Sequence, residues 1–203
     1  MDETLATQLI DMAEADRRLR DLLARDGTLF DGYHPAMRAL HEQNARRLAE
    51  IVARVGWPGR NLVGPDASKA AWLIAQHAIS RSDLQRKWLL LLQRAAARGE
   101  VRAAEPAYLL DRIRMLEGRP QIYGTQFDWT AAGRLEPHPI EAEPEVDRRR
   151  ATVGLEPMAE MVGRMRQAAA QELPAADWQR RRTDMESFAQ EVGWRGEQPA
   201  FGR

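Results

Sequence analysis

The feature that most constrains the fold is the spacing of apolar residues, which recur three and four positions apart through most of the 203 residues. This spacing places them on one face of an α-helix. Gly27 and the segment "GWPG" at 56–59 interrupt the pattern, as glycine and proline do where helices end. We predict helices over residues 3–25, 35–55, 66–80, 82–98, 106–118, 144–152, 157–171 and 174–190.

The predicted helix over residues 82–98 has two distinctive features. Ser82 and Gln85 have the spacing of a capping box, in which each side chain bonds a free backbone N–H of the first turn. The run "WLLLL" at 88–92 makes the helix apolar nearly all round, which is typical of a helix at the centre of a bundle.

The pattern changes after Gly118. The segments "QIYGTQFDW" and "RLEPHPI", with a turn at "TAAG" between them, predict an antiparallel hairpin over residues 121–140. The expected fold is therefore mainly α. It is a single-domain helical bundle over residues 1–192 with one short embedded β-hairpin, followed by a C-terminal tail over 193–203.

Composition excludes several classes of function. Thirty basic residues balance thirty acidic ones, so charge gives no reason to expect nucleic acid or an anionic membrane as a partner. The absence of cysteine excludes disulfides, thiolate metal ligands and a cysteine nucleophile. The first residues are acidic rather than signal-like, and no apolar run is long enough to cross a bilayer. We expect a soluble cytoplasmic protein.

Four polar residues interrupt the apolar faces of three predicted helices: Asp16, His41, Asn44 and His77. A polar group that faces a core destabilises the fold unless it is hydrogen-bonded. Local bonding, for example of Asp16 by Arg20, explains any one of them, whereas four together favour a shared site. We expect Asp16 and His41 to be shielded from water, and alanine at either position to cost about 1–3 kcal/mol.

The helix over 106–118 and the hairpin add polar groups that we expect to complete this site. Asp111 and Arg112 are adjacent and point about 100° apart, so they do not pair with each other and one reaches inward. In a regular strand Gln121, Tyr123 and Thr125 share one face, while Gly124 permits a bend or the approach of a ligand. An exposed charge pair and a solvated hairpin face are the alternatives.

Four segments together resemble an uncharacterised family of bacterial domains: "GWPGRNLVGPDASKAAWLIAQHA", "YLLDRIR", "EGRPQIYGTQF" and "RRRATVGLEPM". The family's ordered signature is Gly-Trp-Pro, Gln-His-Ala, Asp-Arg, Gln-x-Tyr-Gly-Thr-Gln and Arg-x-x-x-Gly-Leu, and the likeness covers roughly residues 16–165. The resemblance implies signature positions at His77, Asp111, Arg112, Gln121, Tyr123, Gly124, Thr125 and Gln126, then Arg149 or Arg150 and Gly154–Leu155. It implies no activity.

The chemistry that these residues favour is general acid–base catalysis. Phosphate-loop, dinucleotide and nucleophile-elbow motifs do not occur. Asp16, His41 and His77 match a two-histidine, one-carboxylate metal set, but no H-x-x-x-H pair supports it and we expect neither metal nor other cofactor. His77 can exchange a proton near neutral pH, and an aspartate can orient its second nitrogen.

We therefore expect a cofactor-independent enzyme that hydrolyses, transfers or cyclises a small polar metabolite, its small-molecule ligand. The predicted catalytic residues are His77, Asp111 and Tyr123, and the predicted substrate-binding residues are Asp16, His41, Asn44, Arg112, Gln121, Gly124, Thr125 and Gln126. The alternative is a non-catalytic module that binds a ligand or a peptide in the same polar pocket. In both, the hairpin edge forms one wall of the pocket, and the other includes His77 and the Asp111–Arg112 helix.

Overall fold

The computed structural model describes residues 1–30, 32–169 and 178–195. Nine α-helices lie within these ranges: α1 Glu3–Arg25, α2 Pro35–Val55, α3 Arg60–Val63, α4 Pro65–His77, α5 Ser82–Ala97, α6 Ala104–Leu116, α7 Val146–Thr152, α8 Met158–Ala168 and α9 Trp178–Glu191. Two short strands, β1 Phe127–Trp129 and β2 Leu135–Pro137, form an antiparallel hairpin. The predicted fold class, mainly α with one short embedded hairpin, is confirmed.

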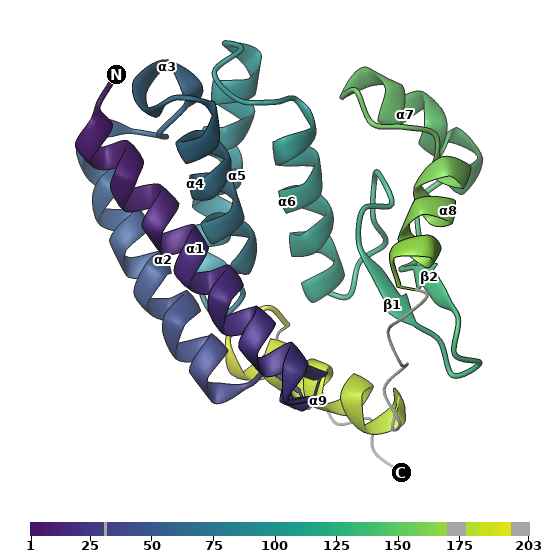
Figure 1. Ribbon diagram of the computed structural model, residues 1–203. Helices are drawn as coiled ribbons and strands as arrows, with labels where there is room; N and C mark the ends of the chain where they lie inside the picture. The colour runs from purple at the N-terminus through teal and green to yellow at the C-terminus, as the bar shows by residue number, and fades with distance from the viewer. Residues whose placement is uncertain (31, 170–177, 196–203) are drawn as a thin grey trace.

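The first six helices form a bundle, and α6 separates it from the hairpin, α7 and α8 (Figure 1). Helix α1 packs along α4, and α5 packs along α6. The core between them is built from the residues of the apolar faces, such as Leu9, Leu48, Ile74 and Leu92, which are almost completely buried. Burial of these faces, rather than the helix propensity of single residues, stabilises the bundle.

The boundaries of the first two helices follow the sequence signals. The Asp2 carboxylate accepts a hydrogen bond from the backbone N–H of Leu5, and Pro35 occupies the first turn of α2, where its missing N–H is not needed. Both helices have the predicted bounds. Helix α4 instead ends at His77, three residues before the predicted end, and the single-turn helix α3 was not predicted.

The predictions for α5 are wrong in two respects. Arg81 is the N-cap residue and makes no capping bond with its side chain, while the Gln85 side chain bonds the backbone carbonyls of Ala75 and Gln76. The helix is also amphipathic rather than central: Trp88 is buried, whereas Leu90 is 57 % exposed. The Gln85 side chain thus satisfies free backbone carbonyls at the end of α4, rather than free backbone N–H groups at the start of α5.

The predicted hairpin is shorter than residues 121–140. Gln121 and Ile140 form an isolated bridge that is parallel rather than antiparallel as predicted, residues 122–126 form a loop, and antiparallel pairing starts at Phe127 opposite Pro137. Gly124 has φ +67°, a left-handed conformation that breaks strand alternation. Gln121, Tyr123 and Thr125 therefore do not share the face of a strand.

The C-terminal part of the described chain packs onto the bundle. Trp194 is buried and its indole N–H donates to the carbonyl of Ile79 at 2.7 Å. Trp194 belongs to the predicted tail, whose residues 196–203 lie outside the described residues, as does the predicted helix start at 174. Within the described ranges, no helix is both long and apolar enough to span a membrane.

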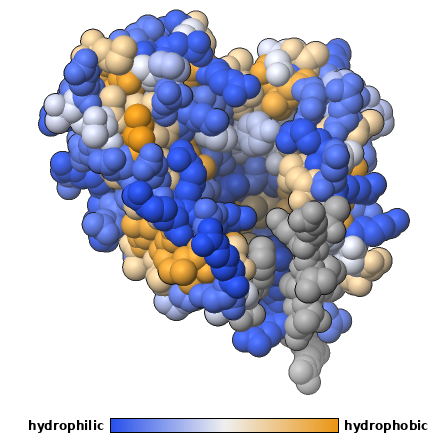
Figure 2. Space-filling model, in the orientation of Figure 1, coloured by the Kyte–Doolittle hydropathy of each residue, from blue (hydrophilic) through white to orange (hydrophobic). Residues whose placement is uncertain are grey.

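The surface is hollowed between the bundle and the part formed by the hairpin, α7 and α8 (Figure 2). A cavity of about 530 Å³ lies where the end of α6, both strands and α9 meet, and His138 and Arg119 are among its lining residues. A smaller cavity of about 150 Å³ lies beside Tyr33, with Ile79 and Phe188 in its wall.

Candidate functional site

Three helices bring Asp16, His41 and His77 together. Asp16 lies in the middle of α1, His41 in the second turn of α2, and His77 at the last position of α4. One ligating atom from each lies within 4.8 Å of the others. Asp16 and His41 are buried, with 1 % and 8 % exposure, as predicted, and the His77 side chain is 23 % exposed.

A single carboxylate oxygen connects the three side chains. Oδ2 of Asp16 is 2.7 Å from Nδ1 of His77 and 3.1 Å from Nε2 of His41. On its other side, His41 Nδ1 is 2.7 Å from the hydroxyl of Tyr33. The observed neighbours of Asp16 are thus the two imidazoles. Arg20, the local partner in the alternative explanation, is not among them.

The environment fixes the protonation state of this network. Burial alone would raise the pKa of Asp16. The hydrogen bonds from His41 and His77 and the charges of the two imidazoles outweigh this effect and hold the pKa of Asp16 below its usual range. Burial raises the pKa of Tyr33 to about 12, so its hydroxyl stays protonated beside Nδ1 of His41. Burial also lowers the pKa of His77, although the bond to Asp16 opposes this. At neutral pH the centre holds an ionised carboxylate and a neutral His77.

Two further predicted site residues lie next to this centre. The Asn44 amide donates to the backbone carbonyl of Met12, one turn before Asp16, and so ties α2 to α1. Arg112 reaches from α6 to the end of α4, where its Nη1 donates to the carbonyl of Gln76 at 3.2 Å. Asp111 and Arg112 therefore do not pair with each other, as predicted, but both of them bond other parts of the chain, whereas only one was expected to reach inward.

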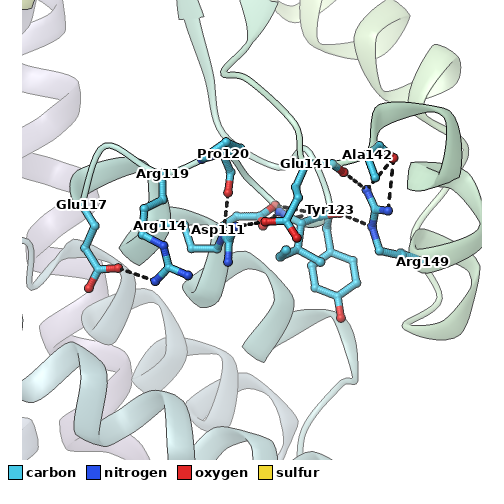
Figure 3. Close-up of polar contacts among 10 residues, drawn as sticks. Asp111, Arg114, Glu117, Arg119, Pro120, Tyr123, Glu141, Ala142 and Arg149 are labelled. Atoms are coloured by element: carbon cyan, nitrogen blue, oxygen red, sulfur yellow. Dashed lines mark hydrogen bonds and ion pairs between the residues drawn. The ribbon is translucent and has the colours of Figure 1, made fainter.

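The Asp111 carboxylate is fully buried and organises the loop after α6 (Figure 3). It accepts hydrogen bonds from the backbone N–H groups of Ile122, Tyr123 and Thr125, and from the Thr125 hydroxyl, at distances of 2.8–3.2 Å. Both oxygens are occupied by protein donors. This bonding explains why residues 122–126 do not continue as a strand.

The remaining polar groups of the loop bond one another. The Gln121 side chain donates to the carbonyls of Gln126 and His138 and accepts from the Gln126 N–H, while the Gln126 amide donates to the Thr125 hydroxyl. Arg149 donates to the carbonyl of Ile122 at 2.8 Å (Figure 3).

Arg150, which is fully buried, donates to the carbonyl of Tyr123. Gly124 sits so close to Ile140 and Met158 that a Cβ would lie 2.7 Å from an Ile140 methyl. The loop thus has a structural explanation that requires no ligand.

The predicted residues therefore form two groups on either side of α6. No hydrogen bond between described residues joins the Asp16–His41–His77 centre to the Asp111 loop. Tyr123 lines a hollow together with residues from the end of α5 and the start of α6. His77 comes just before α5 and so lies near the other end of that helix.

Sequence reasoning missed Tyr33, which lies in the segment between η1 (Thr28–Phe30) and α2. It also placed Gln85 at the wrong helix end. Neither the contact of Tyr33 with His41 nor the bonds of Gln85 to the end of α4 produce a periodic pattern in the sequence.

Comparison with known proteins gives one match. A family model described as a family of unknown function, DUF6624, matches residues 3–173. This chain belongs to the DUF6624 family. The predicted membership of an uncharacterised family is thus confirmed, and the match begins earlier and ends later than the resemblance over 16–165. No curated protein and no solved structure matches the chain significantly.

The DUF6624 match includes all three residues of the Asp16–His41–His77 centre and the whole Asp111 loop. It ends before α9, whose Phe188 ring packs edge-on against Tyr33 with the centroids 5.1 Å apart. The cavity beside Tyr33 is thus lined on one side by matched residues and on the other by residues beyond the match.

Proposed function

We propose that this DUF6624 protein is an enzyme that acts on a small polar metabolite by general acid–base catalysis, with His77 as the group that exchanges the proton. The observation that carries the proposal is the 2.7 Å contact between His77 Nδ1 and Asp16 Oδ2. A carboxylate bonded to one imidazole nitrogen fixes the tautomer that leaves the other nitrogen free to act as a base.

The proton transfer follows from this arrangement. The substrate's O–H or N–H donates its proton to Nε2 of His77, for which no described residue is a hydrogen-bond partner. The imidazolium that forms is stabilised by the Asp16 charge, and the proton then passes to the leaving atom or to the product. Because burial lowers the pKa of His77, the imidazole is neutral and ready to accept a proton at pH 7. Hydrolysis, transfer and cyclisation all contain such a step.

The second imidazole keeps the carboxylate in place. His41 lies behind the carboxylate, with its Nδ1 2.7 Å from the Tyr33 hydroxyl and its Nε2 3.1 Å from Oδ2 of Asp16. The carboxylate thus lies between two imidazoles, which favours the orientation in which Oδ2 bonds His77. Such support by residues behind the reacting group is what keeps a catalytic side chain in a productive geometry.

The cavity beside Tyr33 supports a small substrate. Its volume is about 150 Å³, and its lining combines apolar side chains such as Ile79 and Phe188 with the charged Arg181 and Asp184. A cavity of this size accommodates a group of about six heavy atoms.

A divalent metal at Asp16, His41 and His77 is the second candidate. The three ligating atoms lie within 4.8 Å of one another and match a two-histidine, one-carboxylate set. Two nitrogens bound to one ion at about 2.1 Å each are at most about 4.2 Å apart, so the set would contract around an ion. His77 Nδ1 would then be a ligand rather than a donor to Asp16. A metal content of one ion per chain that is lost in Asp16→Ala would favour this candidate.

The test of the catalytic proposal is a substrate screen with matched variants. The protein is incubated with a polar metabolite extract of the cells that produce it, and mass spectrometry follows which compounds are consumed and formed. His77→Asn keeps an N–H near the position of Nδ1 but removes Nε2, and it should lower turnover by at least about 100-fold. The control is His34→Asn, which replaces one N-cap acceptor by another.

The outcomes separate the candidate functions. Turnover that needs His77 and not His34 supports the proposal. Turnover by folded His77→Asn at the wild-type rate contradicts it. A compound that the wild type binds but never converts favours the ligand-binding module instead.

A further inference from the structure

The cavity at the end of α6 lies apart from the two groups of predicted site residues. It has a volume of about 530 Å³ and is lined by the end of α6, both strands and α9. None of its described lining residues belongs to the Asp16–His41–His77 centre or to the Asp111 loop. Pockets that bind small molecules have volumes of about 300–1,000 Å³, and this one has room for roughly 20 heavy atoms. We call it the hairpin cavity.

Helix α9 forms one wall of the hairpin cavity and is tied to the rest of the protein at both ends. Near its start, Arg181 forms an ion pair with Asp128 of β1, with 3.0 Å between nitrogen and oxygen. At its end, Glu191 pairs with Arg38 of α2 at 2.8 Å. The chain that follows is anchored by the buried Trp194. Contacts within the protein thus form the walls before any ligand binds, as is usual for small-molecule pockets.

Among the described residues, Arg195 is a lining cation without a counter-charge. Its Nε donates to the backbone carbonyl of Leu116 at 3.1 Å. The guanidinium lies against Gly118, where a Cβ would be 3.3 Å from Cζ. Bonding a carbonyl at a helix end is a structural role for an arginine. It uses one of the five N–H donors, and no described carboxylate pairs with Arg195, so its two terminal nitrogens remain for a ligand.

The carboxylates that line the hairpin cavity do not exclude an anion, because each of them forms an ion pair with an arginine. The pairs are Asp128 with Arg181, Glu136 with Arg134 at 3.1 Å, and Glu186 with Arg182 at 3.1 Å. Arg166 lies 3.9 Å from Glu136 as a second partner. Positive charge is therefore in excess around the cavity, and it favours an anionic ligand.

The lining also offers flat apolar surfaces and a neutral polar group. Trp129 contributes an indole ring, and Pro120, Pro137 and Pro139 contribute pyrrolidine rings. Burial lowers the pKa of His138, so at pH 7 its imidazole is neutral and offers one donor and one acceptor. Aromatic rings pack against one another in offset or edge-on geometry, so these surfaces suit a ligand with a flat ring.

We propose that the hairpin cavity binds a small organic anion that carries a flat ring. Its carboxylate or phosphate bonds the terminal nitrogens of Arg195, in hydrogen bonds that the two charges strengthen. Its ring packs against Trp129, and His138 bonds a polar atom of the ligand. The site shares no residue with the Asp16–His41–His77 centre, so the inference does not depend on the proposed function.

The experiment measures the binding of probes that share one ring and differ in charge. 1-Naphthyl phosphate, 1-naphthoate and uncharged 1-naphthol are titrated separately into the full-length protein at pH 7, and calorimetry gives the Kd and the stoichiometry. NMR follows the indole N–H of Trp129, which is assigned by its loss in Trp129→Leu. We expect at least one of the two anions to bind once per chain, with a Kd below about 1 mM, and to shift the Trp129 signal. 1-Naphthol should bind at least about 10-fold more weakly.

Matched variants test the two parts of the site separately. Arg195→Gln should weaken binding of the anion about 10–100-fold and change that of 1-naphthol by less than about 2-fold. Trp129→Leu should weaken the binding of anion and 1-naphthol alike, by about 3–10-fold. Arg54→Gln on the exposed side of α2 is the control and should leave binding unchanged. If Arg195→Gln does not fold, the comparison with 1-naphthol and the Trp129→Leu variant decide the question.

Several results would overturn the inference. These are no saturable binding of either anion below about 1 mM, equal affinity for 1-naphthol, and wild-type affinity in folded Arg195→Gln. An anion that binds without shifting the Trp129 signal occupies another place and also overturns it. If the anions bind as expected, the tighter of the two identifies the preferred charged group as a phosphate or a carboxylate.

Discussion

Replacement of Asp16 by alanine is expected to destabilise the protein by about 2–4 kcal/mol. The buried Nε2 of His41 lies 3.1 Å from the carboxylate, and loss of this charged neighbour leaves it with no polar group nearby, at a cost of about 1–3 kcal/mol. His77 is partly exposed and can bond water instead, so loss of its bond adds about 0.5–1.5 kcal/mol. The free energy of unfolding is measured by urea denaturation at pH 7.5.

The same substitution changes the dependence of stability on pH. Asp16 has a pKa below its usual range in the folded protein, so its contribution is present above the unfolded value of about 3.9 and is lost as pH falls through the folded value. Asp16→Ala should therefore be destabilising at neutral pH and approach the wild type under strongly acidic conditions. A loss of less than about 0.5 kcal/mol at pH 7.5 would refute the reasoning, because it would mean that neither imidazole depends on the carboxylate.

Three other substitutions test the rest of the account by the same urea assay. Asp111→Asn should cost about 2–4 kcal/mol because it turns one acceptor of the loop N–H groups into a donor, whereas exposed Asp11→Asn should change stability by less than about 0.5 kcal/mol. Gly124→Ala should cost about 1–3 kcal/mol, since φ is +67° and a Cβ would lie 2.7 Å from Ile140; a neutral effect would contradict the close packing. Burial raises the pKa of Glu105 to about 7, so stability falls as pH rises from about 4.5 to 7. Glu105→Gln should therefore exceed the wild type by about 1–3 kcal/mol at pH 8 and equal it near pH 4.5, and equal stability at both pH values would contradict this.

Periodicity was sufficient to predict the helices because each apolar face is a local property of the chain. Helices α1 and α2 have the predicted bounds, and the polar residues on their apolar faces are buried. Periodicity does not specify which faces meet. It could place Asp16, His41 and His77 on inward faces but could not show that one carboxylate oxygen serves both imidazoles, which depends on how three helices pack.

The loop after α6 shows where local pattern is misleading. The alternation of residues 121–126 predicts a strand, yet the carboxylate of Asp111, ten residues earlier, collects the N–H groups that a strand partner would have used. A side chain that competes for backbone donors changes the local structure and leaves no periodic signal. Gly124 was the one sequence sign of the bend, through the freedom of its φ angle.

The protonation of the His77 imidazole tests the central claim most directly. Nitrogen NMR of labelled protein at pH 7.5, with the signals assigned through His77→Asn, distinguishes a protonated from an unprotonated ring nitrogen. The structure predicts a neutral ring with the proton on Nδ1, bonded to Asp16, and with Nε2 unprotonated and free to accept a proton. An unprotonated Nδ1, as in a metal ligand, or a doubly protonated ring at this pH would contradict the assignment of His77 as the catalytic base.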